Sequence, residues 1–324
     1  MKKLHKEGLY GHVLKEGSGI ELSINDVSSV EMDERFNVPV MNFDNYVLPT
    51  SRRDLRELSM VSGRSIHTIE DLLDSLKRHY DSVAKRIVGV KIGLAYERKL
   101  SFDKTERGEA EKVFNRIYRT RTFESIDVMP YGSRPLSRNV PTGIDLADAK
   151  PLQDYMVHLI IQLAGRYGHP VQIHTGLHEG NENIISNSNP DLLVNLFMEY
   201  PEVKFDVFHA GYPYFRELAT IAKNFPNVYP DLCWIHIVSP KAARIILSEW
   251  LDMVPSNKIL AFGGDYRFVE GVYGHIKIAR RNVAKVLNEK VEEEEIGLKQ
   301  AFSLSKKILR ENAIKLFNLK ERLP

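Results

Sequence analysis

The sequence contains a single cysteine, Cys233, in 324 residues. One cysteine excludes an intrachain disulfide and a cysteine-rich zinc module, and it fits a reducing compartment. Within its apolar run, Cys233 is expected to pack rather than to act as a nucleophile. No apolar run approaches the roughly 18 residues of a membrane span. The basic start MKKLHKEGLYGH lacks the apolar segment of a signal peptide behind it. We therefore predict a cytoplasmic protein with no membrane partner.

An excess of charge of one sign is also absent. The 45 Lys and Arg residues against 43 Asp and Glu residues give a net charge of +2. This balance predicts no attraction to nucleic acid or to an anionic membrane. Internal repeats and linker-like segments are missing too, so we predict a single domain over residues 1–324. The length is sufficient for one α/β barrel.

Short apolar runs alternate with helix-like stretches along the chain. The runs are bounded by turn residues and rich in β-branched or aromatic side chains, which is typical of buried strands. We predict strands at 38–43, 87–94, 170–173, 203–208, 228–234 and 258–264. Apolar residues at helical spacing predict helices at 52–59, 68–85, 104–123, 152–167, 191–200, 214–224, 241–251, 273–288 and 297–317. Residues 124–150 are predicted as a loop or a short excursion near the edge of the sheet. The alternation predicts a parallel sheet flanked by helices.

Three of the predicted strands end on a polar residue that could carry chemistry. His174 ends VQIHTG, His209 ends FDVFHAG and Asp265 ends LAFGGD. Taken singly, a histidine there is often only hydrogen-bonded, and an Asp after Gly-Gly is often a turn or cap residue. Their recurrence at the same point of three units favours a shared site, because the C-terminal strand ends of an α/β barrel meet where ligands bind. Two imidazoles and a carboxylate suit zinc or another divalent ion, and the carboxylate could accept a proton from metal-bound water.

Lys91 stands inside the apolar run VGVKIGL. A buried ammonium is costly unless it is paired or modified. Two orientations are open. Lys91 either points into the barrel as a ligand-binding cation or carbamylated metal bridge, or points outward with its stem along the surface.

Three further residues are candidates for substrate binding. His178 lies four residues after His174, on the predicted loop at the strand end. Arg267 and His275 follow the GGD motif on the same unit. The guanidinium of Arg267 suits a carboxylate or phosphate, although an exposed arginine is also an ordinary surface residue.

The motifs HPVQIHTG, FDVFHAGYP, LAFGGDYR and ENAIKLFNL occur in this order. Together they resemble the amidohydrolase superfamily, in particular its amidohydrolase-related (type 2) branch, which includes decarboxylases and is related to uronate isomerases. The resemblance covers residues 38–319. It implies a (β/α)8 TIM-barrel-like fold and a divalent metal, most often zinc. It also implies that His174 and His209 are the metal ligands ending strands 5 and 6, and that Asp265 ends strand 8 as ligand and proton shuttle.

The chain departs from the family at its beginning. Family members carry an H-x-H pair at the end of strand 1, and no H-x-H occurs in this sequence. About 37 residues precede the strand at 38–43, too few for two βα units of roughly 30 residues each. We therefore expect a barrel that is incomplete at its N-terminus, with about six recognisable strands. The alternative is a shortened strand such as 19–24, with other residues replacing the lost ligands. An incomplete barrel exposes two edges, which favours a homo-oligomer or a less stable chain.

Three functions are consistent with these residues. The first is a metal-dependent hydrolase that attacks a carbon–nitrogen, ester or lactone bond with a metal-activated water. The second is a uronate isomerase or non-oxidative decarboxylase, in which Lys91 or Arg267 binds the carboxylate of a small-molecule substrate. The third is an inactive truncated remnant or binding protein, which the absent H-x-H pair favours. A pair of cationic side chains facing the metal beside an open pocket would distinguish the second from the first.

Overall fold

The computed structural model describes residues 8–120 and 143–323. These residues form two compact units. The first draws on the ranges Met1–Asn42, Ala84–Ser101 and Ala164–Pro324, and the second on Phe43–Val83 and Phe102–Leu163. The first unit contains the sheet and the second is helical. A single domain over residues 1–324 stays a prediction.

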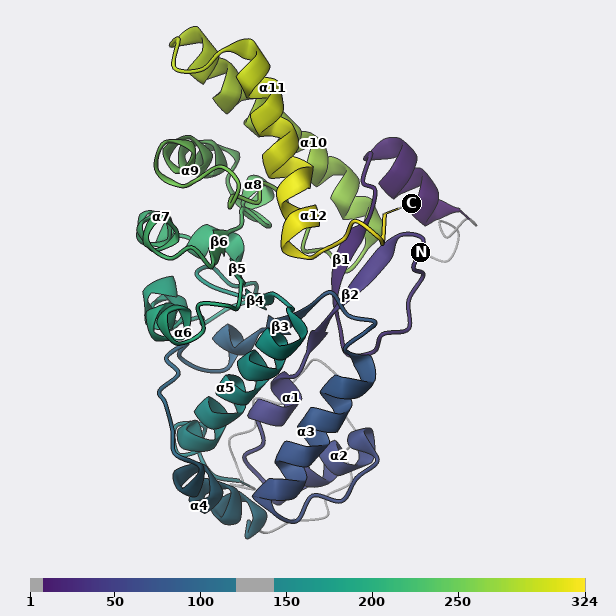
Figure 1. Cartoon of the computed structure of the whole chain (residues 1–324), viewed down its shortest axis with the longest axis vertical. Helices are drawn as coiled ribbons and strands as arrows, with labels where there is room; N and C mark the ends of the chain where they lie inside the picture. The colour runs from purple at the N-terminus through teal and green to yellow at the C-terminus, as the bar shows by residue number, and fades with distance from the viewer. Residues whose placement is uncertain (1–7, 121–142, 324) are drawn as a thin grey trace. The chain divides into compact units, whose positions relative to one another are not determined.

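The sheet has six parallel strands whose spatial order is their order in the chain. Figure 1 shows them as β1 (Ser23–Val27), β2 (Asn37–Asn42), β3 (Gly89–Ile92), β4 (Val171–Ile173), β5 (Phe205–Val207) and β6 (Val228–Pro230). Every residue of β3, β4 and β5 is buried, as expected for parallel strands covered on both faces. Sequential parallel pairing is the arrangement of a TIM-barrel wall, so the predicted α/β class is confirmed.

The six strands are not the six that the sequence predicts. The predicted strand at 258–264 is wrong: Leu260 forms one isolated parallel bridge to Asp231, and the N–H of Ala261 donates to Ile308 in the last helical segment instead. Conversely, β1 lies near the alternative shortened strand at 19–24. Its sequence, SINDV, is only half-buried and has no apolar run, which is why periodicity does not identify it.

Helices of the first unit follow the predicted pattern. They are α6 (Val194–Glu199), α7 (Phe215–Asn224), α8 (Ile235–Val238), α9 (Pro240–Met253), α10 (Val269–Glu292), α11 (Leu298–Lys306) and α12 (Asn312–Leu316). Pro240 is the first residue of α9, and the Ser239 hydroxyl accepts a hydrogen bond from the Ala242 N–H as its cap. No helix within residues 8–120 and 143–323 is long and apolar enough to cross a membrane.

The second unit consists of α1 (Asp44–Val47), α2 (Arg52–Ser62), α3 (Ile69–Val83), α4 (Arg107–Tyr118) and most of α5 (Lys150–Tyr167). Ser51 and Asp54 form a reciprocal capping box at the start of α2. Phe43 stacks on Tyr80 in its core, with ring centroids 5.1 Å apart. The end of the helix predicted at 104–123 and most of the loop predicted at 124–150 lie outside the described residues.

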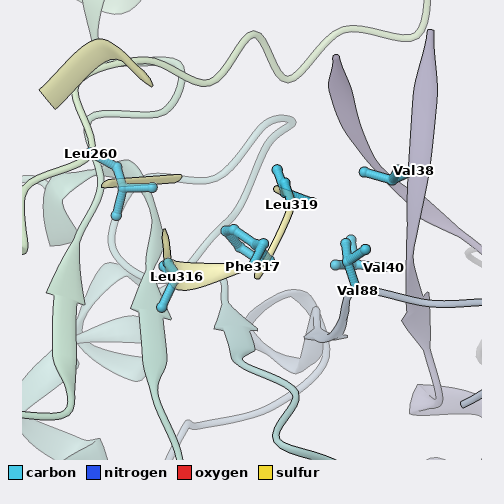
Figure 2. Close-up of a cluster of buried hydrophobic side chains, with 7 residues drawn as sticks. All are labelled: Val38, Val40, Val88, Leu260, Leu316, Phe317 and Leu319. Carbon is cyan, nitrogen blue, oxygen red and sulfur yellow. The ribbon is translucent and has the colours of Figure 1, made fainter. Parts of the chain in front are cut away.

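One apolar cluster fills the interior of the first unit at the N-terminal end of the strands. It joins strand residues to the last segment of the chain, and its members are Val38, Val40, Val88, Leu260, Leu316, Phe317 and Leu319. Figure 2 shows Phe317 and Leu319 between Val40 and Leu260. Ile24 of β1 packs against the same cluster. The strand β1, at one edge of the sheet, and Leu260, which bridges to the residue after β6 at the other edge, therefore share one core through side chains.

Candidate active site

Three strand-end residues predicted to share a site lie together at the C-terminal end of the sheet. His174 follows β4, and the backbone N–H of His174 donates to the Ile92 carbonyl of β3. The Nε2 atom of His209 is 3.0 Å from Nδ1 of His174 and 3.8 Å from Oδ2 of Asp265. Both imidazoles are buried, whereas the Asp265 side chain is 48% exposed. The predicted convergence is thus present in the structure.

The hydrogen bonds of the two imidazoles define their tautomers. Nδ1 of His209 lies 3.0 Å from the Cys233 carbonyl oxygen, and Nε2 of His174 lies 3.1 Å from that of Leu177. A carbonyl only accepts, so these two nitrogens carry the protons. The nitrogens that face each other, Nδ1 of His174 and Nε2 of His209, are therefore both acceptors. Two lone pairs at 3.0 Å repel each other unless a cation lies beside them, which fits a metal-binding pair.

Burial keeps both imidazoles neutral. It lowers the pKa of His174 well below its usual value, and the charges of His209 and Lys91 add to the effect. Burial, with the Lys91 ammonium next in importance, lowers the pKa of His209 to about 3. Neutral imidazole is the form that ligates a metal, so both side chains are ready for that role near pH 7.

A polar layer lies along the strands beside these imidazoles. Lys91, Gln172 and Asp206 are neighbours in the register of β3, β4 and β5, so their side chains point to the same face. The Nε2 atom of Gln172 donates to Oδ2 of Asp206 at 2.9 Å. Burial raises the pKa of Asp206 to about 7, and it raises the pKa of Asp231 well above its usual value.

Lys91 takes the inward orientation. Its side chain is 7% exposed, and Nζ lies 3.5 Å from the centroid of the Phe208 ring. Its positive charge opposes the burial effect on the pKa values of Asp206 and Asp231. The ammonium is thus stabilised by an aromatic face and by carboxyl groups.

Sequence reasoning missed Asp26, an exposed residue of the edge strand β1. Partial desolvation raises the pKa of Asp26, while the Lys91 charge and a hydrogen bond from Asn42 lower it and the Asp265 charge raises it. Asp26 therefore belongs to the same electrostatic cluster as Lys91 and Asp265. The only signal in the sequence is its place in a short polar strand, which periodicity does not detect.

Tyr96 was also missed, although it follows β3 at the same rim. Its ring centroid is 4.6 Å from that of His174 and 4.8 Å from that of His178. Burial raises the pKa of Tyr96 to about 12, and the positive charge of Arg267 lowers it slightly in return. Arg267 is exposed and follows Asp265 by two residues.

His178 belongs to the same aromatic cluster. Its ring lies nearly parallel to that of His174, at an interplanar angle of 17° and a centroid distance of 4.9 Å. The side chain is 5% exposed. Neither ring nitrogen has a hydrogen-bond partner among the described residues.

His275 is placed differently from the other candidates. It lies on α10, is 1% exposed, and its ring packs 5.1 Å from Phe262 and 5.6 Å from Tyr266, measured between centroids. Burial lowers the pKa of His275 to about 4. These contacts are those of a packing residue, and its role in substrate binding stays a prediction.

The turns that present the site have unusual backbone geometry. His209 follows β5, Trp234 follows β6 and Asp265 follows the 258–264 segment. All three have positive φ values, of 63°, 68° and 56°. Each non-glycine residue in this region costs about 1–3 kcal/mol, and such residues cluster at functional sites. Gly176 of HTG has φ 66°, and a Cβ there would lie 2.4 Å from backbone atoms of Gly211 and Tyr212. This turn therefore requires glycine.

The donor set fits a divalent ion without forming a complete site. Within residues 8–120 and 143–323, no three His, Cys, Asp or Glu side chains have the arrangement of a formed metal site. His174 and His209 present two converging lone pairs, and Asp265 lies one short movement away at 3.8 Å. Two imidazole nitrogens and a carboxylate are the ligand types that zinc prefers.

The chain is similar in sequence to known proteins. Residues 137–319, more than half of the chain, match the model of the amidohydrolase family. The curated protein fluG of Emericella nidulans is 29% identical over 271 residues, which cover 80% of this chain. The chain spans only 29% of the length of that relative.

Solved structures show the same fold at low sequence identity. A protein described as a metal-dependent hydrolase, from Lactobacillus casei, has a TM-score of 0.75 at 16% identity, over 97% of this chain and 77% of its own. A uronate isomerase from Thermotoga maritima has a TM-score of 0.74 at 16% identity, over 94% of this chain and 69% of its own. A glucuronate isomerase from Caulobacter crescentus has a TM-score of 0.71 at 16% identity, over 98% of this chain and 68% of its own.

Proposed function

The chain belongs to the amidohydrolase family, and from this premise we propose that it is a metal-dependent hydrolase. His174 and His209 hold a divalent ion, zinc by preference, and Asp265 is the proton acceptor. The observation that carries the proposal is the pair of imidazole nitrogens, Nδ1 of His174 and Nε2 of His209, that face each other at 3.0 Å beside the Asp265 carboxylate. A purely structural pair of neutral histidines would place a donor against an acceptor.

The residues divide the work between binding and proton transfer. A divalent ion bound here supplies Lewis acidity, which polarises a carbonyl group and makes water more acidic. The carbonyl oxygens of Cys233 and Leu177 orient the two imidazoles and keep their inner nitrogens unprotonated. Oδ2 of Asp265 accepts the proton of the attacking water and returns it to the leaving nitrogen or oxygen. The bond broken is a carbon–nitrogen, ester or lactone bond.

We assign the substrate a carboxylate group. Arg267 is exposed and follows Asp265 by two residues, and the Asp265 carboxylate lies 3.8 Å from Nε2 of His209. A guanidinium binds a carboxylate through two parallel hydrogen bonds. Lys91 does not complete a cationic pair with it, because its ammonium is buried against the Phe208 ring.

Uronate isomerisation or decarboxylation is the second candidate. Arg267 favours it, because those substrates carry a carboxylate. It needs a stronger anion site than one exposed arginine, and for that reason hydrolysis comes first. An inactive remnant or binding protein is the third candidate, and metal analysis decides it.

The experiment combines metal analysis with a substrate panel. Wild type and Asp265→Asn are loaded with Zn²⁺, freed of excess metal and assayed on amides, lactones and uronates. We expect bound zinc in both proteins and a fall of about 10²–10⁴-fold in kcat for Asp265→Asn, the usual contribution of a general acid–base group. Equal activity of the two proteins removes Asp265 from the mechanism. No bound metal in wild type supports the remnant, and conversion of a uronate without hydrolysis supports the isomerase.

Location and assembly remain proposals from the sequence. We propose the cytoplasm as the location, because the single cysteine is free and buried and such cysteine usage fits a reducing compartment. The expected homo-oligomer rested on open sheet edges. Ile24 of the edge strand β1 and Leu260, which bridges to the residue after the edge strand β6, pack in one apolar cluster, and this weakens the argument from open edges.

A further inference from the structure

We propose that His236 is a positioning residue for Asp265. Its imidazole donates to the Ala261 carbonyl and so fixes the backbone of residues 261–265, which places the Asp265 carboxylate beside His209. This inference rests on the proposed function, because it concerns the proton acceptor of the same reaction. His236 is neither a ligand nor a catalytic group, since both of its ring nitrogens bond to other partners.

The first observation is that the Asp265 carboxylate depends on the backbone for its position. The side chain is half-exposed, and no described residue forms a hydrogen bond with the carboxylate. Its Oδ2 atom lies 3.8 Å from Nε2 of His209, which is beyond hydrogen-bond distance. The residue has a φ of 56°, in the left-handed region that few non-glycine residues adopt. The direction of the carboxylate is therefore set by the segment before it.

The second observation concerns the backbone of that segment. Residues 261–264 belong to no strand, and individual hydrogen bonds fix their position. The Ala261 N–H donates to the Ile308 carbonyl at 2.9 Å. The Gly263 carbonyl accepts from the Trp234 N–H at 2.9 Å. The Ala261 carbonyl accepts from a side chain, through Nε2 of His236 at 2.8 Å.

The third observation is a chain of hydrogen bonds that places the proton on this Nε2. The Arg244 guanidinium of α9 donates to Oδ1 of Asn282 on α10 at 3.2 Å. Nδ2 of Asn282 lies 3.2 Å from Nδ1 of His236. A guanidinium only donates, so the amide oxygen faces it and the amide nitrogen donates to Nδ1. Nδ1 is then the acceptor, and Nε2 carries the proton that it donates to Ala261.

Burial strengthens this chain of hydrogen bonds. His236 is fully buried and Asn282 is buried, so water does not compete for the bonds between them. Burial also lowers the pKa of His236, which keeps the imidazole neutral. Removing the imidazole N–H would leave the Ala261 carbonyl unpaired in the interior, a costly state that a shift of the segment relieves.

A shift at Ala261 reaches Asp265 because the backbone between them has little freedom. A Cβ added at Gly263 would lie 2.4 Å from Sγ of Cys233, so the segment passes tightly against this side chain. Proton transfer depends on the placement of the acceptor, and a misplacement of about 1 Å costs on the order of 10²-fold in rate. A buried imidazole outside the site thus controls the geometry of the proton acceptor.

The first test is structural and needs neither metal nor substrate. Crystal structures are compared for wild type, His236→Phe, which keeps a ring without an N–H, and His236→Gln, whose amide can donate to the same carbonyl. In His236→Phe the distance from Oδ2 of Asp265 to Nε2 of His209 should change by about 1 Å or more. His236→Gln should keep the wild-type distance. An unchanged distance in His236→Phe overturns the inference.

A measurement on wild type alone covers the case in which a variant does not fold. Nitrogen-15 NMR of protein labelled at histidine should show His236 as a neutral imidazole with its proton on Nε2. A proton on Nδ1 would mean that His236 does not donate to Ala261, and the inference would be wrong.

The second test is kinetic and uses Zn²⁺-loaded protein with the substrate of the panel that wild type converts fastest. The kcat of His236→Phe should fall on the order of 10²-fold, with KM and Zn²⁺ affinity unchanged, because the change affects the transition state alone. His236→Gln should recover most of this loss. Asn227→Leu is the matched control, because the buried Asn227 amide also donates to backbone carbonyls, those of Phe197 and Tyr200. Asn227 precedes β6, at the other end of the strands, so this variant should lose stability without losing kcat.

The outcomes separate this inference from the proposed function. If wild type binds no Zn²⁺ or converts no substrate, the metal-dependent hydrolase fails, and the crystal structures alone decide whether His236 positions Asp265. If wild type is active and His236→Phe keeps the wild-type kcat, the inference is overturned while the hydrolase survives. An equal fall of kcat in Asn227→Leu assigns the effect to general destabilisation and also overturns the inference.

Discussion

The two ends of the strands in the first unit differ in what their side chains do. At the N-terminal end, Val40, Phe317 and Leu319 form an apolar cluster with almost no contact with solvent. At the C-terminal end, imidazoles and carboxyl groups lie close together, and the turns carry residues with positive φ. The apolar end gains free energy from burial, whereas the polar end loses some to desolvation and backbone strain. Stability and chemistry are thus separated along the same strands.

The largest effect is expected from breaking a turn at the polar end. Gly176→Ala places a Cβ 2.4 Å from the backbone of Gly211 and Tyr212, at a φ that already disfavours a side chain. We expect a loss above roughly 4 kcal/mol in the free energy of unfolding, or no folded protein. Gly180→Ala is the control, since it shares the positive φ without the contact and should cost only about 1–2 kcal/mol. Urea denaturation measures both, and equal losses would contradict the steric explanation.

The next effect tests the apolar end. Phe317→Ala removes a 3% exposed side chain from the centre of the cluster and should cost about 3–5 kcal/mol of unfolding free energy. Zinc affinity of the folded fraction should not change, because the cluster lies at the other end of the strands. Phe302→Ala, at a site 64% exposed, should stay within about 0.5 kcal/mol of wild type. A large loss of zinc affinity in Phe317→Ala would show that the two ends are coupled.

The smallest expected effect is a change in how the folding stability depends on pH. His209 has a pKa of about 3 in the folded chain against about 6.5 when unfolded, so below pH 6.5 the unfolded state binds the proton first. Its contribution to stability is complete above pH 6.5 and is lost as pH falls toward 3. Between pH 7.5 and 5.5 we expect a loss of about 1.4 kcal/mol from this residue. His209→Gln should lack this part of the loss, while Phe317→Ala should show the wild-type pH dependence. A pH profile unchanged by His209→Gln would mean that the imidazole is not buried in neutral form.

The sequence was sufficient where a strand is apolar and its end is polar. His174 and His209 could be placed because each closes a buried run, and parallel strands bring such ends to one rim. His178 contacts neighbouring aromatic and imidazole rings at this rim. The spacing of residues in the sequence does not predict these ring contacts.

Where the local pattern is weak, prediction failed. β1 is polar and half-buried, so Asp26 could not be found before the strand was known. The segment 258–264 reads as a strand from its apolar residues, yet Ala261 bonds to the Ile308 carbonyl of a distant helical segment. Such long-range hydrogen bonds override local propensity, and a single sequence does not reveal them.

The participation of residues 316–319 in the interior of the sheet has a kinetic consequence. Ile24 and Val38, near the beginning of the chain, gain Phe317 and Leu319 as apolar neighbours only after those two residues have been synthesised. Contacts of such large sequence separation form slowly, since a long loop must close first. During translation the early strands would therefore remain exposed, and chaperones would have their longest opportunity to act before the final turn of helix arrives.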